Sequence, residues 1–250
     1  MASPSEFPGP CNHGDWLGSS NPADGQGAAL PEEALTTDSQ RTRRSRILDA
    51  AVEIARRGGY DRVHMRDIAE GADVSLATVY QYFPSKVHLL TIALSRELLR
   101  FDSFLLDDLQ GVEDPFARLR LVVWRLINGM EESDRVTEAL AHAYVASHAA
   151  AAAEADTVRR QTTELFAHQI SRCSHADFVP MSVTAEVLAD VWTSEILGLV
   201  QGPRTYADIR RRLSTVIDLV ARGRSAGAHQ ATPMGFADSA APIESNGSHD

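Results

Sequence analysis

The side chains best able to do chemistry in this chain lie together, between Ser75 and Lys86. On a helical wheel centred on Val79, Leu76 and Phe83 share one apolar face. The side chains that point away from that face are Ala77, Thr78, Tyr80 and Gln81, and Tyr82 lies at its border. Hydroxyl, amide and small groups on one helix face can reach base edges and phosphates in a DNA major groove. The tyrosines are equally compatible with the edge of a protein core.

Two short helices around a tight turn are predicted to position these groups. Ile68, Ala69 and Ala72 give the first helix an apolar face. Asp73 stands where the chain must turn, and Ser75 can cap the second helix. The pattern is that of a helix-turn-helix.

Positive charge is concentrated in the same part of the chain. The 250 residues include 24 Lys or Arg and 34 Asp or Glu, so the net charge of -10 repels polyanions from the molecule as a whole. Residues 41–90 nevertheless hold nine basic and six acidic side chains. A nucleic-acid site must therefore be a local patch here, although a solvated helix face would carry the same charges.

Four basic residues near the motif are candidates for phosphate contacts. Lys86 is the only lysine in the chain and falls in the first turn of a helix, where backbone N–H groups and the helix dipole favour an anion. An ordinary exposed lysine is the alternative. Arg41, Arg43 and Arg44 could reach DNA as an arm or simply be solvated.

Enzyme, metal and membrane interpretations find little support. The sequence has no glycine-rich phosphate loop, HExxH, GxSxG or Cys-x-x-Cys motif, so we expect no catalytic residue, cofactor or metal. Cys11 and Cys173 are too few for a disulfide framework, and the first residues do not form a secretory signal. Acidic residues interrupt the most apolar stretches, so we expect a cytoplasmic protein without a membrane span.

The rest of the pattern predicts an all-α fold. Gly58-Gly59 should end the first helix, Ser85 and Asp114-Pro115 should begin two others, and Thr205 with Asp208 should open the last. Further helices are expected near 135–149, 153–174, 183–200 and 206–222. The predicted organisation is a disordered tail at 1–38, a helix-turn-helix DNA-binding domain at 39–86, a helical ligand-binding and dimerisation domain at 87–222, and a disordered tail at 223–250.

Several short runs between Arg44 and Leu90 together resemble the DNA-binding domain of the TetR family of bacterial one-component regulators. They are Ile47-Leu48-Asp49-Ala50-Ala51, Gly59-Tyr60, Ile68-Ala69, Ala72-Asp73-Val74-Ser75 and Thr78-Val79-Tyr80-Gln81-Tyr82-Phe83-Pro84-Ser85-Lys86. Within that family, the run from Tyr82 to Leu90 with Ala141 to Val145 and Asp190-Val191-Trp192 looks most like the KstR-type repressors of actinobacterial sterol catabolism.

The resemblance implies contacts to operator DNA. It places Thr78, Tyr80, Gln81 and Tyr82 on the DNA, with Ser75 and Lys86 on phosphates, and we add Ala77 and Arg44 to this set. Two positions depart from the family pattern. Asp73 replaces the usual Gly of the turn but tolerates the left-handed conformation, and His64 replaces a Thr or Ser cap.

The helical remainder offers a dimer interface and a ligand pocket. The apolar faces of the last two helices predict a four-helix interface between two copies, formed by Leu188, Val191, Glu195, Leu199, Leu213, Val216, Ile217 and Val220. The candidate pocket residues are Phe101, Trp124, Asn128, Met130, Tyr144, Phe166, Met181 and Trp192. The alternative for both sets is that these residues simply form the core of their own domain.

The predicted function is a dimeric repressor of a palindromic operator, released by a small apolar effector. The sterol likeness would make that effector a sterol-derived acyl-CoA, with Arg118, Arg120 or Arg125 near its phosphates. The alternatives are a TetR-like sensor of another hydrophobic compound that controls efflux, and a helical ligand-binding protein or enzyme without operator binding.

Overall fold

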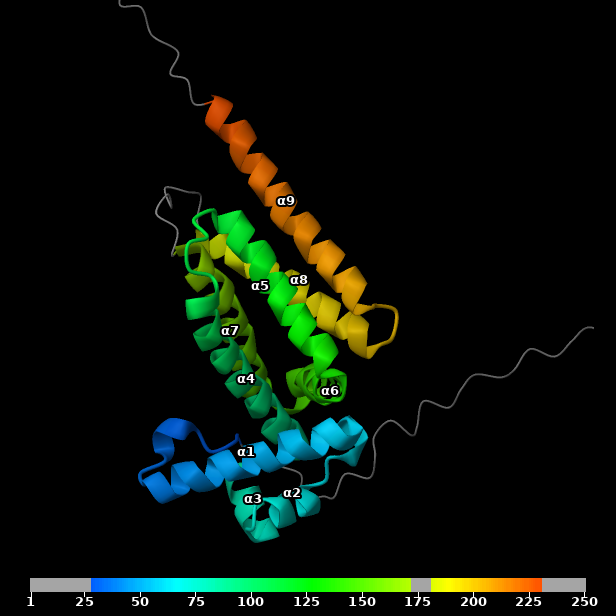
Figure 1. Ribbon diagram of the computed structural model, residues 1–250. Helices are drawn as coiled ribbons and strands as arrows, with labels where there is room; N and C mark the ends of the chain where they lie inside the picture. The colour runs from blue at the N-terminus through cyan, green and yellow to red at the C-terminus, as the bar shows by residue number, and fades with distance from the viewer. Residues whose placement is uncertain (1–27, 172–180, 231–250) are drawn as a thin grey trace, which may run out of the picture.

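The computed structural model describes residues 28–171 and 181–230, and within these ranges it is helical without strands (Figure 1). The helices are α1 (Asp38–Gly58), α2 (Met65–Gly71), α3 (Leu76–Tyr82), α4 (Lys86–Asp108), α5 (Pro115–Glu132), α6 (Asp134–Ala150), α7 (Ala152–Ser171), α8 (Met181–Val200) and α9 (Tyr206–Gln230), with 3-10 turns η1 (Glu32–Ala34) and η2 (Tyr60–Arg62). The predicted all-α class is confirmed. None of the described helices is both long and apolar enough to cross a membrane.

The capping signals in the sequence set the helix ends. The Asp114 side chain accepts a hydrogen bond from the Ala117 N–H at 2.7 Å and starts α5. The Thr205 hydroxyl accepts from the Asp208 N–H, and the Asp208 carboxylate accepts from the Thr205 N–H in return, both at 3.2 Å. Ser85 stands at the cap of α4 as expected, but its hydroxyl pairs with His88 Nδ1 at 2.9 Å and not with the backbone.

Gly59 ends α1 in a backbone conformation that side chains rarely adopt. Its φ is 68° and its ψ is -162°, and its N–H donates to the Ala55 carbonyl. A Cβ atom at Gly59 would also contact the Glu138 carboxylate of α6, at the end of a side chain that can move aside. The backbone conformation is therefore the main reason for glycine at this position.

Replacing Gly59 by Ala should destabilise the protein by about 1–3 kcal/mol, because the left-handed conformation is strained for an L side chain and Glu138 must move. Gly129→Ala is the matched control, because Gly129 lies within α5 and an added Cβ there meets nothing within 4 Å. Thermal unfolding of both variants tests this, and an equal loss in both would contradict the special role of Gly59.

Asp73 forms the turn of the helix-turn-helix as predicted. Its φ of 51° is the only positive value among the described non-glycine residues. Arg46 of α1 donates hydrogen bonds to the carbonyls of Ala72 and Asp73 and so ties the turn to the first helix. His64 precedes α2 without a side-chain cap, as its departure from the family pattern indicates.

Two hydrophobic cores meet at α4 and α6. The first core joins α1, α2, α3 and the start of α4, and it also includes Val136, Ala139, Leu140 and Ala143 of α6. The second core joins α4 to α9 and includes Ala141 and Tyr144 of the same helix α6. The predicted boundary between residues 86 and 87 is therefore not a break in packing, because α4 and α6 belong to both halves (Figure 1).

The structure moves the inner boundary of both predicted tails. Residues 28–37 pack on the first core, with Ala29 and Leu35 buried and the Leu30 N–H bonded to the Tyr82 carbonyl at 3.0 Å. These few apolar residues find a partner surface that composition alone could not reveal. At the other end, α9 runs to Gln230 and not to 222. Residues 1–27 and 231–250 lie outside the described residues, as do Cys11 and Cys173.

Candidate DNA-binding surface and ligand cavity

Helix α3 presents a small polar face. Ala77, Tyr80 and Gln81 are exposed, and Thr78 is half-buried beside them. The Ser75 hydroxyl caps the helix by accepting from the Thr78 N–H at 3.1 Å, and it also pairs with the Thr78 hydroxyl at 2.8 Å. A phenol, an amide and a methyl group thus face outward from one short helix, as the wheel predicts.

Tyr82 does not belong to this outer face. It is only 3% exposed, its ring lies 6.3 Å from that of Phe83, and its carbonyl accepts a hydrogen bond from the Leu30 N–H. The prediction that Tyr82 lies on the DNA-facing surface is wrong. Its border position on the wheel allows either side, and the preceding segment covers it.

Lys86 is held at the start of α4 by an aromatic ring. Its ammonium lies 3.8 Å from the centroid of the Tyr60 ring and donates to the Tyr60 carbonyl at 3.2 Å. Burial lowers the pKa of Lys86, and the Asp61 carboxylate partly opposes this. The Tyr60 ring stacks in turn on His142 of α6, with centroids 5.5 Å apart. The position of Lys86 is therefore linked to α6.

Arg44 does not extend toward DNA as an arm. Its side chain is 11% exposed, its guanidinium lies 5.6 Å from the centroid of the Phe83 ring, and it pairs with Glu32 at 3.4 Å. Burial lowers the pKa of Arg44. The prediction of a DNA contact by Arg44 is wrong, because residues 28–35 and Phe83 enclose it.

A cavity of about 420 Å³ opens between α1 and α4 to α8. Four of the predicted pocket residues line it: Phe101, Met130, Tyr144 and Trp192. The Tyr144 hydroxyl pairs with Thr193 at 3.4 Å, and burial raises the pKa of Tyr144. The remaining walls are mostly aliphatic, so the cavity suits an apolar molecule of moderate size.

The other predicted pocket residues lie elsewhere. Phe166 is fully buried in the second core and does not line the cavity. Asn128 accepts a hydrogen bond from Arg210 at 2.9 Å, and Trp124 is exposed beneath the guanidinium of Arg125. The Met181 side chain lies outside the described residues.

The predicted arginines are not at the cavity. Arg118 is buried and donates to the carbonyls of Leu109, Val112 and Gln169, and Arg120 pairs with Asp218 at 2.6 Å. Arg125 lies against Trp124 and does not line the cavity either. The charged side chains that do line it are Arg56 of α1 with Glu97 and Arg100 of α4. No sequence pattern identifies these three residues, because periodicity identifies a polar face but not the neighbour opposite it.

Two family models match the chain over more than half of its length. The model described as "Bacterial regulatory proteins, tetR family" matches residues 47–91, and the model described as "Tetracyclin repressor-like, C-terminal domain" matches residues 113–220. The chain belongs to the TetR family.

Its relatives include named repressors. The chain is 38% identical over 193 residues to the HTH-type transcriptional repressor KstR of Mycobacterium tuberculosis. This alignment covers 77% of this chain and 87% of that protein. It is 36% identical over 197 residues to KstR of Rhodococcus jostii, and the alignment covers 77% of this chain and 89% of that protein. The fold also resembles that of Thermus thermophilus FadR, a TetR-family repressor solved in complex with lauroyl-CoA. The TM-score is 0.58 at 21% identity, and the match covers 80% of this chain and 100% of that chain.

This TetR-family chain is thus a transcriptional repressor that binds operator DNA, and it is not an enzyme. The helix-turn-helix described above is its DNA-binding element.

Half of the predicted dimer residues lie inside the protomer. Leu188, Leu213 and Ile217 are at most 1% exposed in the second core. Glu195 is also buried, where it pairs with Arg204 at 3.1 Å and Arg212 at 2.5 Å. These four predictions are wrong, because each helix has a second apolar face and these residues occupy the inner one.

An apolar outer face of α8 and α9 remains. Val191, Leu199, Val216 and Val220 are half-buried, and the exposed apolar residues beside them are Val183, Val187, Leu197 and Leu219. Exposed apolar side chains grouped on two adjacent helices are typical of a subunit interface. This outer face is where the two helices have surface left to pair with another copy.

Proposed function

We propose that two copies of the chain pair through α8 and α9 and bind a partly palindromic operator. A two-fold axis then presents the two α3 helices to successive major-groove faces, with half-site centres about 34–36 Å apart or a multiple of that spacing. Ala77, Thr78, Tyr80 and Gln81 meet the bases, while Ser75 and Lys86 meet phosphates.

An apolar effector releases the dimer from DNA in this proposal, and a sterol-type acyl-CoA is the first candidate. The observation that carries it is the cavity of about 420 Å³, whose walls include α4 and α6. Both helices also contribute to the DNA-binding core. The lauroyl-CoA bound to Thermus thermophilus FadR and the likeness to the KstR repressors support this class of ligand.

Two connections couple the cavity to the DNA-binding residues. Phe101 of α4 lines the cavity, and the same helix begins at Lys86. Tyr144 of α6 lines the cavity, while His142 of the same helix supports Tyr60 beneath Lys86. A ligand that shifts either helix changes the separation of the two α3 helices, provided that it binds the free conformation more tightly.

Release assays with operator DNA test the effector. Acyl-CoAs, the matching free lipids and cationic drugs are compared for loss of operator binding. Release by acyl-CoAs supports the proposal. Release by cationic drugs and not by acyl-CoAs would identify a sensor of another hydrophobic compound, and intact protein that never shifts promoter DNA at low salt would contradict operator binding itself.

Lys86→Ala should weaken all DNA sites alike and make the slope of log K against log salt shallower by about 0.9, because one phosphate contact is lost. Gln81→Ala is the matched comparison. It should change the preference for operator sequence and leave the slope intact, since an amide reads bases without releasing counterions. Binding isotherms at several salt concentrations measure both. An unchanged slope in Lys86→Ala would remove Lys86 from the phosphate contacts.

A further inference from the structure

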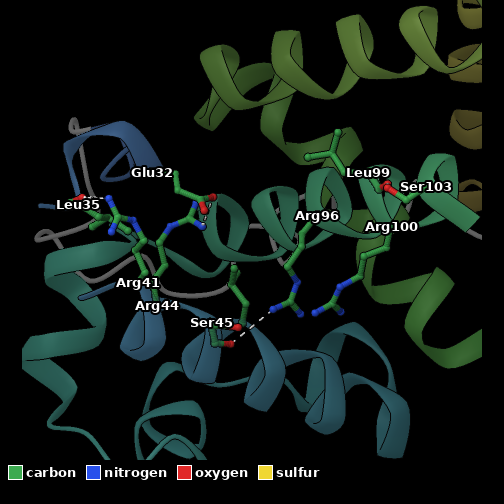
Figure 2. Close-up of a pocket in the computed structure, with 10 residues that line it drawn as sticks. Glu32, Leu35, Arg41, Arg44, Ser45, Arg96, Leu99, Arg100 and Ser103 are labelled. Atoms are coloured by element: carbon green, nitrogen blue, oxygen red, sulfur yellow. Dashed lines mark hydrogen bonds and ion pairs between the residues drawn. The ribbon is translucent and has the colours of Figure 1, made fainter. Parts of the chain in front are cut away.

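A second hollow, of about 450 Å³, lies between residues 32–35, α1 and α4. Figure 2 shows arginines entering it from two walls, Arg41 and Arg44 from α1 and Arg96 and Arg100 from α4. Glu32 is the only carboxylate among the side chains that line it. We call this hollow the arginine groove.

Each arginine of the groove has a carboxylate partner. Arg41 pairs with Asp38 at 2.9 Å and Arg44 with Glu32 at 3.4 Å. Arg96 pairs with Asp49 at 2.8 Å, and Arg100 pairs with Glu97 at 2.9 Å. Of these acids only Glu32 lines the groove, so the lining itself holds four guanidinium groups and one carboxylate, a composition that favours an anion.

Two donors in the groove lack an acceptor. The Nε atoms of Arg44 and Arg96 are buried and have no hydrogen-bond partner among the described residues. Their side chains are only 11% and 18% exposed, so water replaces the missing acceptor poorly. The pKa of Arg44 is lowered first by burial and further by the charge of Arg96, despite the opposing effect of Glu32. Guanidinium groups that share one groove and keep two Nε donors without an acceptor favour an anionic ligand.

The arginine groove and the apolar cavity adjoin along the contact between α1 and α4. Arg100 lines both of them. On α1, Ser45 and Leu48 line the groove, and Val52 and Arg56, on the next turns of the same helix face, line the cavity. One ligand can therefore place an apolar body in the cavity and an anionic end in the groove.

We propose that the arginine groove binds the phosphate groups of the effector, so that a coenzyme A thioester lies with its acyl chain in the cavity and its nucleotide phosphates against Arg96 and Arg100. This inference rests on the proposed function for the class of ligand. Phosphates suit the groove because guanidinium groups bind them through paired, charge-assisted hydrogen bonds. An anion bound there also bridges α1 of the DNA-binding core and α4, the two elements whose relative position sets the operator contacts.

Calorimetric binding of three probes to the full chain tests this: lauroyl-CoA, laurate and coenzyme A. The double variant Arg96→Gln, Arg100→Gln should lose about tenfold or more in affinity for lauroyl-CoA and coenzyme A. Laurate affinity should stay within about twofold of wild type, because the cavity keeps its apolar walls. Arg57→Gln, an exposed position on α1 that lines neither hollow, is the matched control and should change none of the three.

Arg100→Gln alone keeps the test decisive if the double variant unfolds. Arg100 is more than half exposed and its closest ion pair is within α4, so its replacement leaves the packing between α1 and α4 in place. Unchanged lauroyl-CoA affinity in these variants overturns the proposal, as does an equal loss for lauroyl-CoA and laurate. The proposal is also overturned if the wild-type protein binds neither coenzyme A nor lauroyl-CoA.

Operator release separates this inference from the proposed function. If acyl-CoAs release operator from the arginine variants at the wild-type concentration, the groove is not a phosphate site and the proposed function stands. If coenzyme A binds through Arg96 and Arg100 but no acyl-CoA releases operator, the groove stands and the proposed effector is wrong.

Discussion

Leu219→Asp is expected to convert the proposed dimer to a monomer and to weaken operator binding by at least about a hundredfold, because the desolvation of unpaired charges exceeds what the interface can compensate. Leu219 is 57% exposed on α9, and it belongs with Val183 and Val187 of α8 to the exposed apolar residues of these two helices. In a two-fold interface one substitution introduces two carboxylates, one from each copy. A monomer then holds only one half-site.

Sedimentation equilibrium at micromolar concentration and operator binding measure the two effects together. Phe104→Asp is the control, since Phe104 is similarly exposed on α4 and lines neither hollow. It should remain dimeric. A dimeric Leu219→Asp variant with wild-type operator affinity would remove α9 from the interface.

The parts of this fold that the sequence predicts well are decided by neighbours within a few residues. Asp114 and Thr205 cap helices through bonds to positions three residues away, and Gly59 ends α1 through its own backbone. Asp73 is likewise placed in the turn by local conformation. The helix-turn-helix and the outward face of α3 follow from the same short-range rules.

The errors arise where a distant segment decides the outcome. Tyr82 and Arg44 are covered by residues 28–35, whose composition gives little indication of order. Glu195 looks like a surface acid in sequence but is buried between two arginines of a later loop and helix. Helical periodicity says which side chains share a face, and it does not say what packs on that face.

The cavity illustrates the same limit in the functional site. Tyr144 and Trp192 were predicted as cavity residues because they are large and aromatic, and both line the cavity. Phe166 is also large and aromatic, but it is fully buried in the hydrophobic core. Arg56 and Arg100 carried no signal, since each sits on a helix whose polar face is otherwise solvated. Their role depends on how α1 meets α4, which only the three-dimensional arrangement reveals.

Gly129→Phe is expected to keep operator binding while losing at least about tenfold in sensitivity to the acyl-CoA effector. Gly129 lines the cavity, and a Cβ atom added there meets nothing within 4 Å, so the first atom of a side chain fits without a backbone shift. A phenyl group in the cavity occupies volume that the ligand needs.

The consequence for regulation follows from linkage. A typical effector weakens DNA binding by about 5- to 150-fold, and it can do so only through its different affinities for the free and DNA-bound forms. Blocking its entry removes that difference without touching α3, so the variant should repress at effector concentrations that release wild type. Gly223→Phe is the matched control, since Gly223 of α9 lies in equally open space but lines no hollow of the described residues. Titration of preformed operator complexes with acyl-CoA measures the effect, and equal release of wild type and Gly129→Phe would place the effector outside this cavity.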